Sequence, residues 1–201
     1  MKIEKFLARH YELWPTLGWR TLEGQRRRFE TIRKLLSPLI PPLHRTRYCE
    51  IGCGLGDLIP WLPNKAFYSG YDQNWEYIQF CRKRYSDPAH QFTLFTIDPE
   101  SLDLASEISG RHELPDFIVM SGLFSGWKKE QIYPFLETLV GCSVGGIVFN
   151  LLMETEQRIL EGDTCFDREE IRDLITDISY EREVTDHWDE LLKDVTVLLK
   201  E

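Results

Sequence analysis

Between Tyr48 and Leu152 the sequence alternates short apolar runs with stretches of helical spacing. The five runs that we expect to be strands are Tyr48–Ile51, Ala66–Tyr71, Phe92–Ile97, Phe117–Met120 and Ile147–Leu152. The helices expected between them cover 57–62, 75–85, 101–109 and 129–142. Strands that alternate with helices form parallel sheets, because each helix returns the chain to the edge where it began. The last run is apolar on both faces, as a buried parallel strand is.

The end of the chain departs from this alternation. Asp167 and Glu170 have the spacing of a capping box that begins a further helix. Two more strands are expected over Tyr180–Val184 and Asp194–Leu199, separated by only about nine residues. That gap is too short for a helical crossover, so this pair must be antiparallel. The sequence therefore predicts an α/β fold: a Rossmann-like doubly wound, mostly parallel seven-stranded sheet with a C-terminal antiparallel hairpin strand.

Charge and cysteine usage limit the partners. The 33 acidic and 24 basic residues give a formal net charge of −9, which opposes attraction to nucleic acid or to an anionic membrane. The five cysteines lack the paired spacing of a zinc site, so we expect free thiols and no metal. The N-terminus has no apolar signal segment, and we expect a cytoplasmic protein without nucleic-acid or membrane partners.

A glycine-rich turn follows the first strand, in Gly52-Cys53-Gly54-Leu55-Gly56-Asp57. Glycine permits a positive φ and lets a ligand approach the backbone closely. Asp57 stands where a dinucleotide-binding fingerprint has its third glycine, and Glu50 precedes the turn. A carboxylate at position 50 would attract a ligand ammonium group and repel a pyrophosphate. This argues against a nicotinamide-dependent oxidoreductase. Asp72 ends the second strand, where an acidic side chain can bind both ribose hydroxyls.

These segments resemble the motifs of class I S-adenosylmethionine-dependent methyltransferases over roughly residues 45–155. Glu50-x-Gly52-x-Gly54-x-Gly56 is similar to the first motif of the family, and Asp72 to its ribose-binding acid. Asp98, after the third strand, is similar to the adenine-side residue, and Phe117–Gly122 to the fourth motif. The resemblance implies S-adenosylmethionine as cofactor. The core residues that it places at the cofactor are Glu50, Gly52, Cys53, Gly54, Gly56, Asp72, Gln73, Asp98 and Ser121.

A narrower resemblance is to a group of bacterial methyltransferases without assigned substrates. It rests on Gly18-Trp19, Gln25–Phe29, Ser121–Phe124, Phe149–Leu151 and His187. The resemblance divides a single methyltransferase domain, residues 1–201, into three parts. These are an N-terminal helical lid segment (1–44), a cofactor-binding core (45–155), and a C-terminal helix with antiparallel strands (156–201).

The N-terminal segment is expected to form helices over 3–13 and 21–37, separated near Gly18-Trp19. If it closes over the cofactor, Trp19 would exclude water from the methyl-transfer path. Arg28 would then pair with the cofactor's methionine carboxylate, since a guanidinium binds a carboxylate through two parallel hydrogen bonds. Packing of this segment against the sheet edge alone is the alternative.

Methyl transfer needs a close, aligned nucleophile in a dry site, and a base only where the acceptor must lose a proton. His187, expected in the loop between the last two strands, is a candidate base. Asn150 interrupts a buried strand and is a second candidate, with core hydrogen bonding as its alternative role. We expect a methyltransferase with a small-molecule substrate. The alternative is a catalytically silent S-adenosylmethionine-binding protein that acts through a partner.

Overall fold

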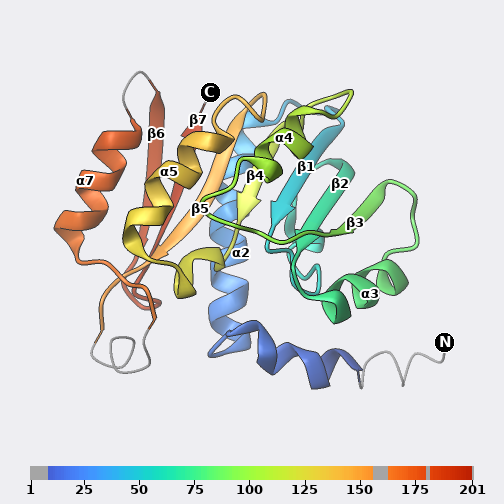
Figure 1. Ribbon diagram of the computed structural model, residues 1–201, viewed down its shortest axis with the longest axis horizontal. Coiled ribbons are helices and arrows are strands. Elements are labelled where there is room, and N and C mark those ends of the chain that lie inside the picture. The colour runs from blue at the N-terminus through green and yellow to red at the C-terminus, as the bar shows by residue number, and fades with distance from the viewer. Residues whose placement is uncertain (1–8, 156–162, 180–181, 201) are drawn as a thin grey trace.

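The computed structural model describes residues 9–155, 163–179 and 182–200. They form one seven-stranded sheet of order β3-β2-β1-β4-β5-β7-β6 (Figure 1). The strands are β1 (Thr46–Ile51), β2 (Lys65–Asp72), β3 (His90–Leu94), β4 (Phe117–Met120), β5 (Gly146–Leu152), β6 (Glu183–Asp189) and β7 (Asp194–Lys200). Strands β1 to β5 pair in parallel, and β7 is antiparallel to both β5 and β6. The predicted Rossmann-like sheet with its antiparallel end is confirmed.

Helices cover both faces of this sheet (Figure 1). On one face lie α4 (Asp103–Ser109), α5 (Lys129–Leu139) and α7 (Arg168–Ile178), which pack in one buried cluster with the sheet. On the other face lie α2 (Leu22–Leu36), α3 (Trp75–Arg84) and the short 3-10 turn η3 (Ile59–Trp61). Three further 3-10 turns are η1 (Trp14–Leu17), η2 (Ser37–Leu39) and η4 (Leu123–Gly126). This arrangement buries both faces of the central parallel strands.

Local signals in the sequence begin two of these helices. The Asp167 carboxylate accepts hydrogen bonds from the backbone N–H groups of Glu169 and Glu170, and Glu170 returns the contact to Asp167 N–H, so the predicted capping box is present. Thr21 caps α2 by accepting from Gly24 N–H at 3.0 Å. These caps fix where the chain turns into each helix.

Two predicted elements are wrong near the glycine turn. The helix expected over 57–62 is only the 3-10 turn η3, because Leu62, which precedes Pro63, is extended with φ −70° and ψ 125°. The third strand ends at Leu94 rather than Ile97. Leu94 pairs with Asp72, the last residue of β2, so the residues beyond it have no neighbouring strand to pair with.

The C-terminal hairpin is tighter than expected. β6 extends to Asp189 and pairs with β7 from Glu183 onward, which leaves only residues 190–193 as the connection. The prediction that His187 lies in a loop is therefore wrong, since it belongs to β6. Residues 180 and 181, the expected start of that strand, lie outside the described residues.

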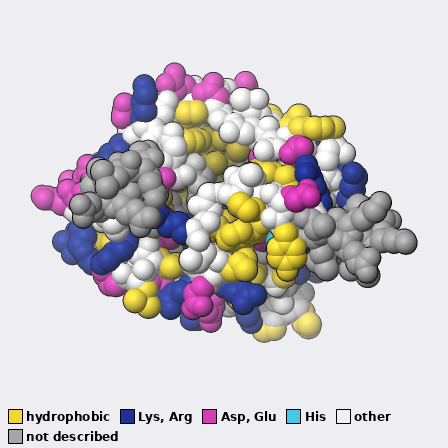
Figure 2. Space-filling view, turned by 90° about the horizontal axis from the view of Figure 1, so that it is seen from below, with side chains coloured by type: hydrophobic (Ala, Val, Ile, Leu, Met, Phe, Trp, Pro, Cys, Tyr) yellow, Lys and Arg dark blue, Asp and Glu magenta, His cyan; other side chains and the backbone are white. Residues whose placement is uncertain are grey.

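The described part of the N-terminal segment lies along the edge of the sheet at which β1 and β4 end (Figure 1). Residues 9–13 are helical, as expected, and residues 3–8 of the same predicted helix lie outside the described residues. Figure 2 looks onto this edge and shows hydrophobic side chains near the centre of the surface, with charged side chains mostly towards its rim. Within the described ranges, no helix has the length and apolar character needed to cross a membrane.

Candidate functional site

The glycine turn after β1 has a backbone that other residues would strain. Gly52, Gly54 and Gly56 have φ angles of 74°, 51° and 70°. The N–H groups of Gly52 and Cys53 donate to the Tyr71 carbonyl at 2.8 and 3.0 Å, which ties the turn to β2. A Cβ on Gly54 would lie 2.8 Å from Leu17 Cδ2. The absent side chain therefore lets the Leu17 side chain lie directly on the turn.

Asp72 is buried at the carboxyl end of β2, beside this turn. Its Oδ2 accepts from Gly54 N–H and its Oδ1 from Asn74 N–H, both at 2.8 Å. Burial raises the pKa of the carboxyl group, while these backbone hydrogen bonds act in the opposite direction. Asp72 thus holds the turn in place and still borders the cavity described next.

Glu50 is a second buried carboxyl group, 3% exposed, and lies in β1 two residues before the turn. The Tyr68 hydroxyl donates to its Oε2. Burial raises the pKa of Glu50 to about 8, against the lowering effect of the Tyr68 hydrogen bond. Among the described residues, no lysine, arginine or histidine forms an ion pair with Glu50.

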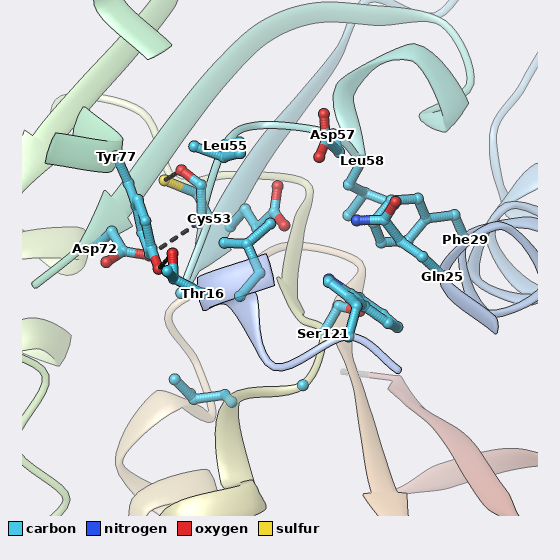
Figure 3. A pocket seen from close by; sticks show the side chains of 17 residues that line it. Thr16, Gln25, Phe29, Cys53, Leu55, Asp57, Leu58, Asp72, Tyr77 and Ser121 are labelled. Atoms are coloured by element: carbon cyan, nitrogen blue, oxygen red, sulfur yellow. Dashed lines mark hydrogen bonds between the residues drawn. The ribbon is translucent and has the colours of Figure 1, made fainter. Parts of the chain in front are cut away.

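A cavity of about 190 Å³, here called the glycine-turn cavity, lies against the turn. Figure 3 shows Thr16, Tyr77 and Asp72 close together on one side, and Gln25 and Phe29 on the other. Its wall comes from four separate parts of the chain: the N-terminal segment, the start of α2, the strand ends with the glycine turn, and α3. The two buried carboxyl groups, Glu50 and Asp72, both border it.

The N-terminal segment is attached to this cavity by specific contacts. The Thr16 and Tyr77 hydroxyl groups share a hydrogen bond of 2.6 Å, and His10 Nε2 lies 3.1 Å from Asp57 Oδ1. Leu17 lies on Gly54, as the distance to its Cδ2 shows. The segment therefore covers the glycine turn rather than only the edge of the sheet.

A second cavity, of about 320 Å³, adjoins the first. The two share four lining residues, which are Leu17, Trp19, Ser121 and Gly122. Ser121 and Gly122 follow β4, so the cavities meet at the carboxyl end of a central strand. The Ser121 hydroxyl is buried and has no hydrogen-bond partner among the described residues. A buried hydroxyl without a partner is costly, so the Ser121 hydroxyl is available to a ligand at this junction.

A buried polar network supports the wall between the cavities. Gly122 N–H donates to Asn150 Oδ1 at 2.7 Å, and Asn150 Nδ2 donates to Asp194 Oδ1 at 3.2 Å. Arg28 Nε donates to Asp194 Oδ2 at 2.6 Å. The Arg28 guanidinium also lies over the Trp19 ring, 4.5 Å from its centroid. Asn150 thus holds Gly122 from inside the core, which is the alternative role considered for it.

The structure brings part of the predicted site together. The predicted residues that line the glycine-turn cavity are Trp19, Glu50, Gly52, Cys53, Gly54, Asp72 and Ser121. Arg28 lines the second cavity instead, and its carboxylate partner is Asp194. Gly56, Asn150 and His187 are not among the residues that line either cavity. Gly56 packs against the Tyr85 ring, and His187 is exposed on β6.

Gln73 and Asp98 also lie outside both cavities. Both are exposed, and Asp98 Oδ1 accepts from Glu100 N–H at 2.9 Å within its own loop. Because β3 ends at Leu94, Asp98 no longer stands at a strand end as expected. The cofactor roles given to Gln73 and Asp98 remain predictions.

Three cavity residues from outside the predicted set are Thr16, Gln25 and Tyr77. Gln25 is 6% exposed, and its Oε1 accepts from Trp14 Nε1 at 3.4 Å. Gln25 belongs to the stretch Gln25–Phe29 on which the narrower resemblance rests, but that resemblance gave it no role at the cofactor. Gln25 lies at the cavity because the N-terminal segment and the start of α2 cross the strand ends there.

No protein-family model matches the chain, and no curated protein matches it in sequence. Similar solved structures do exist. Magnesium protoporphyrin IX methyltransferase (ChlM) from Synechocystis PCC 6803, with bound SAH (S-adenosylhomocysteine), is 12% identical, with a TM-score of 0.68 over 98% of this chain and 96% of that one.

Two further solved structures are methyltransferases as well. The N-methyltransferase NodS from Bradyrhizobium japonicum WM9, in complex with S-adenosylhomocysteine, is 17% identical, with a TM-score of 0.64 over 96% of this chain and 97% of that one. The methyltransferase domain of bacterial CtHen1 is 13% identical, with a TM-score of 0.65 over 89% of this chain and 100% of that one. The chain therefore has the Rossmann-like fold of the class I S-adenosylmethionine-dependent methyltransferases.

Proposed function

We propose that the chain is an S-adenosylmethionine-dependent methyltransferase that acts on a small-molecule acceptor. The observation that carries this proposal is the junction of two cavities at Ser121 and Gly122. One cavity has a glycine turn and two buried carboxyl groups on its wall, which suits a cofactor. The other adjoins it at the end of β4, which suits an acceptor. Transfer of a group between two ligands requires two such adjoining sites.

The residues of the glycine-turn cavity fit S-adenosylmethionine chemically. Glu50 would bind the ammonium group of the cofactor, and Asp72 the ribose hydroxyls. The unpaired Ser121 hydroxyl would hydrogen-bond the methionine part. Gln25, whose amide nitrogen remains available beside its contact with Trp14, would bind the methionine carboxylate in place of Arg28. The solved structures of ChlM and NodS contain S-adenosylhomocysteine, which agrees with this cofactor.

The cofactor supplies a methyl group already activated by a sulfonium. The chain itself has to hold the acceptor in line with that group and exclude water, and such positioning can contribute about 7–11 kcal/mol. Trp19 and Leu17, which border both cavities, would exclude water from the transfer path. Asn150 would act as a positioning residue, because it holds the Gly122 backbone at the junction. Cytoplasmic location remains a prediction from the cysteine spacing, and the absence of nucleic-acid and membrane partners remains a prediction from the charge of the chain.

The first test compares ligands by thermal unfolding. S-adenosylmethionine and S-adenosylhomocysteine should raise the melting temperature. At a ligand concentration a hundredfold above the dissociation constant, binding increases the free energy of unfolding by about 2.7 kcal/mol. NADH should have no effect. A shift with NADH and none with S-adenosylhomocysteine would overturn the assignment.

The second test separates an enzyme from a silent binding protein. The chain is incubated with a metabolite extract and S-adenosylmethionine that carries a labelled methyl group. Label in an extracted small molecule is expected, and with Asp72→Asn it should be reduced about tenfold to hundredfold at S-adenosylmethionine concentrations below the dissociation constant. Binding of S-adenosylhomocysteine without transfer to any extract component would favour the silent protein.

A further inference from the structure

The second cavity has charged as well as hydrophobic side chains on its wall. Among its described lining residues, the charged ones are Arg20, Arg28 and Asp163. Arg20 lies 3.4 Å from Asp163, and Arg28 pairs with Asp194 behind the wall, so each guanidinium group has a carboxylate neighbour. These pairs leave no excess charge, so what the wall can offer a ligand is any guanidinium N–H group that the carboxylates leave unused.

Arg28 is the buried cation of this wall. Its side chain is only 9% exposed, and Asp194, its partner, is 2% exposed and does not border the cavity. The Arg28 Nε and Nη2 groups both lie 2.6 Å from Asp194 Oδ2. Asp194 therefore holds the guanidinium through Nε and Nη2 and does not contact Nη1.

The free edge of this guanidinium is Nη1. A guanidinium has five N–H groups in a fixed plane, and those on Nη1 find no acceptor among the described residues. Nη1 lies 3.4 Å from the point where a side chain on Gly122 would begin. Gly122 has a φ of 79° and lies at the junction of the two cavities. The unused donors are thus close to the site where transfer would occur.

The second cavity also has hydrophobic residues on its wall, beside the polar and charged ones. The hydrophobic residues on its wall are Leu17, Trp19, Leu152, Leu191 and Leu192. Its volume of about 320 Å³ is at the lower end of the range for small-molecule sites, roughly 300–1,000 Å³. It therefore suits a small ligand with an apolar body.

We propose that the methyl acceptor is a small carboxylic acid with an apolar body, whose carboxylate is bound by Arg28 Nη1 in the second cavity. This proposal rests on the proposed methyltransferase function and names its substrate class. The carboxylate oxygens accept from the two free N–H groups of Nη1, and the apolar body packs against the leucines and Trp19. Arg28 is then a specificity-determining residue for the acceptor rather than a cofactor ligand.

The experiment measures binding to protein saturated with S-adenosylhomocysteine. A panel of small aromatic and aliphatic carboxylates, each paired with its own primary amide, is screened by ligand-observed NMR. Carboxylates that bind should do so about tenfold to hundredfold more tightly than their amides, the ratio expected for a charge-assisted hydrogen bond. A panel in which no carboxylate binds better than its amide would refute the proposal.

Variants then locate the contact. The double variant Arg28→Met/Asp194→Asn removes the guanidinium without leaving a buried unpaired carboxylate, and it should abolish the preference for carboxylates. Arg27→Met is the matched control, because Arg27 lies on the same helix as Arg28, pairs with Asp189 of β6 and does not border the cavity. An unchanged preference in the double variant would show that Arg28 is not the ligand.

The affinity for S-adenosylhomocysteine separates the two proposals. It should be the same in wild type and in the double variant, because Arg28 does not line the glycine-turn cavity. If the wild type fails to bind S-adenosylhomocysteine, the proposed function itself is wrong. If it binds S-adenosylhomocysteine but shows no preference for carboxylates, only the acceptor class is wrong.

Discussion

Arg28 and Asp194 form a buried ion pair across 166 residues of sequence, with 2.6 Å between Arg28 Nε and Asp194 Oδ2. The pair joins α2 to the start of β7 and continues through Asn150 to Gly122. It connects the N-terminal segment, the antiparallel end of the sheet and the junction of the two cavities. Disruption of this pair should therefore affect both the stability of the fold and the binding of the acceptor.

Arg28→Met should lower the free energy of unfolding by about 3–5 kcal/mol, because it leaves the Asp194 carboxylate buried without its cation. The double variant Arg28→Met/Asp194→Asn should recover most of that loss. Arg27→Met should cost at most about 1 kcal/mol, since the Arg27 side chain is 39% exposed. Urea unfolding of the three variants measures the differences. Equal losses for Arg28→Met and Arg27→Met would contradict the importance of the buried pair.

Asp72→Asn should weaken S-adenosylhomocysteine binding by about tenfold to hundredfold, the value of a lost charge-assisted hydrogen bond. Asparagine keeps one oxygen as an acceptor for the backbone N–H groups of Gly54 or Asn74, so it disturbs the turn less than alanine would. Asp103→Asn is the matched control. Asp103 is exposed at the start of α4 and lies outside both cavities, so isothermal titration should give wild-type affinity. An equal loss with Asp103→Asn would show that the effect of Asp72→Asn is not specific to the ribose contact.

The stability of the free protein should depend on the protonation of Glu50. Its pKa in the folded state is about 8 because of burial, compared with an ordinary value of 4.5. A raised pKa contributes stability below the ordinary value, and that contribution is lost as the pH rises towards 8. Glu50→Gln cannot ionise, so its melting temperature relative to wild type should increase between about pH 5 and pH 8. A constant difference over this range would mean that Glu50 ionises at its ordinary pH.

Cofactor binding should release a proton from the same residue. If the ammonium group of the cofactor pairs with the Glu50 carboxylate, the S-adenosylhomocysteine affinity of wild type should rise by up to about tenfold per pH unit between about pH 5.5 and 7.5. Glu50→Gln should bind more weakly at neutral pH and show a flat pH profile. Calorimetry in two buffers of different ionisation enthalpy counts the released protons. Absence of proton release in wild type would exclude this pairing.

Thr16→Val should loosen the N-terminal segment over the glycine turn, because it removes the 2.6 Å hydrogen bond to the Tyr77 hydroxyl. We expect faster dissociation of S-adenosylhomocysteine and an apparent Michaelis constant for S-adenosylmethionine raised about fivefold, the effect of roughly 1 kcal/mol. Thr138→Val removes a comparable hydrogen bond to Phe135 O on α5, far from both cavities, and serves as control. Equal dissociation rates in wild type and Thr16→Val would show that the segment only packs against the sheet.

Short-range patterns in the sequence determined the sheet and the glycine turn. The apolar runs predicted β1, β2, β4 and β5, because a parallel strand that is buried on both faces consists mostly of consecutive apolar residues. The gap of about nine residues expected between the last two strands was too short for a helical crossover, so this end of the sheet had to be antiparallel. Gly52, Gly54, Glu50 and Asp72 could be placed because each lies at a strand end or directly after one, and parallel strands bring these ends to one edge.

Only the tertiary structure decided which groups face which cavity. Asp98 and His187 were misplaced because strand limits depend on the neighbouring strand, which β3 loses beyond Leu94 and β6 keeps up to Asp189. Arg28 was predicted to pair with the methionine carboxylate of the cofactor, whereas in the structure its carboxylate partner is Asp194. Local spacing cannot predict a contact between residues so distant in sequence, because it depends on how α2 packs against β7.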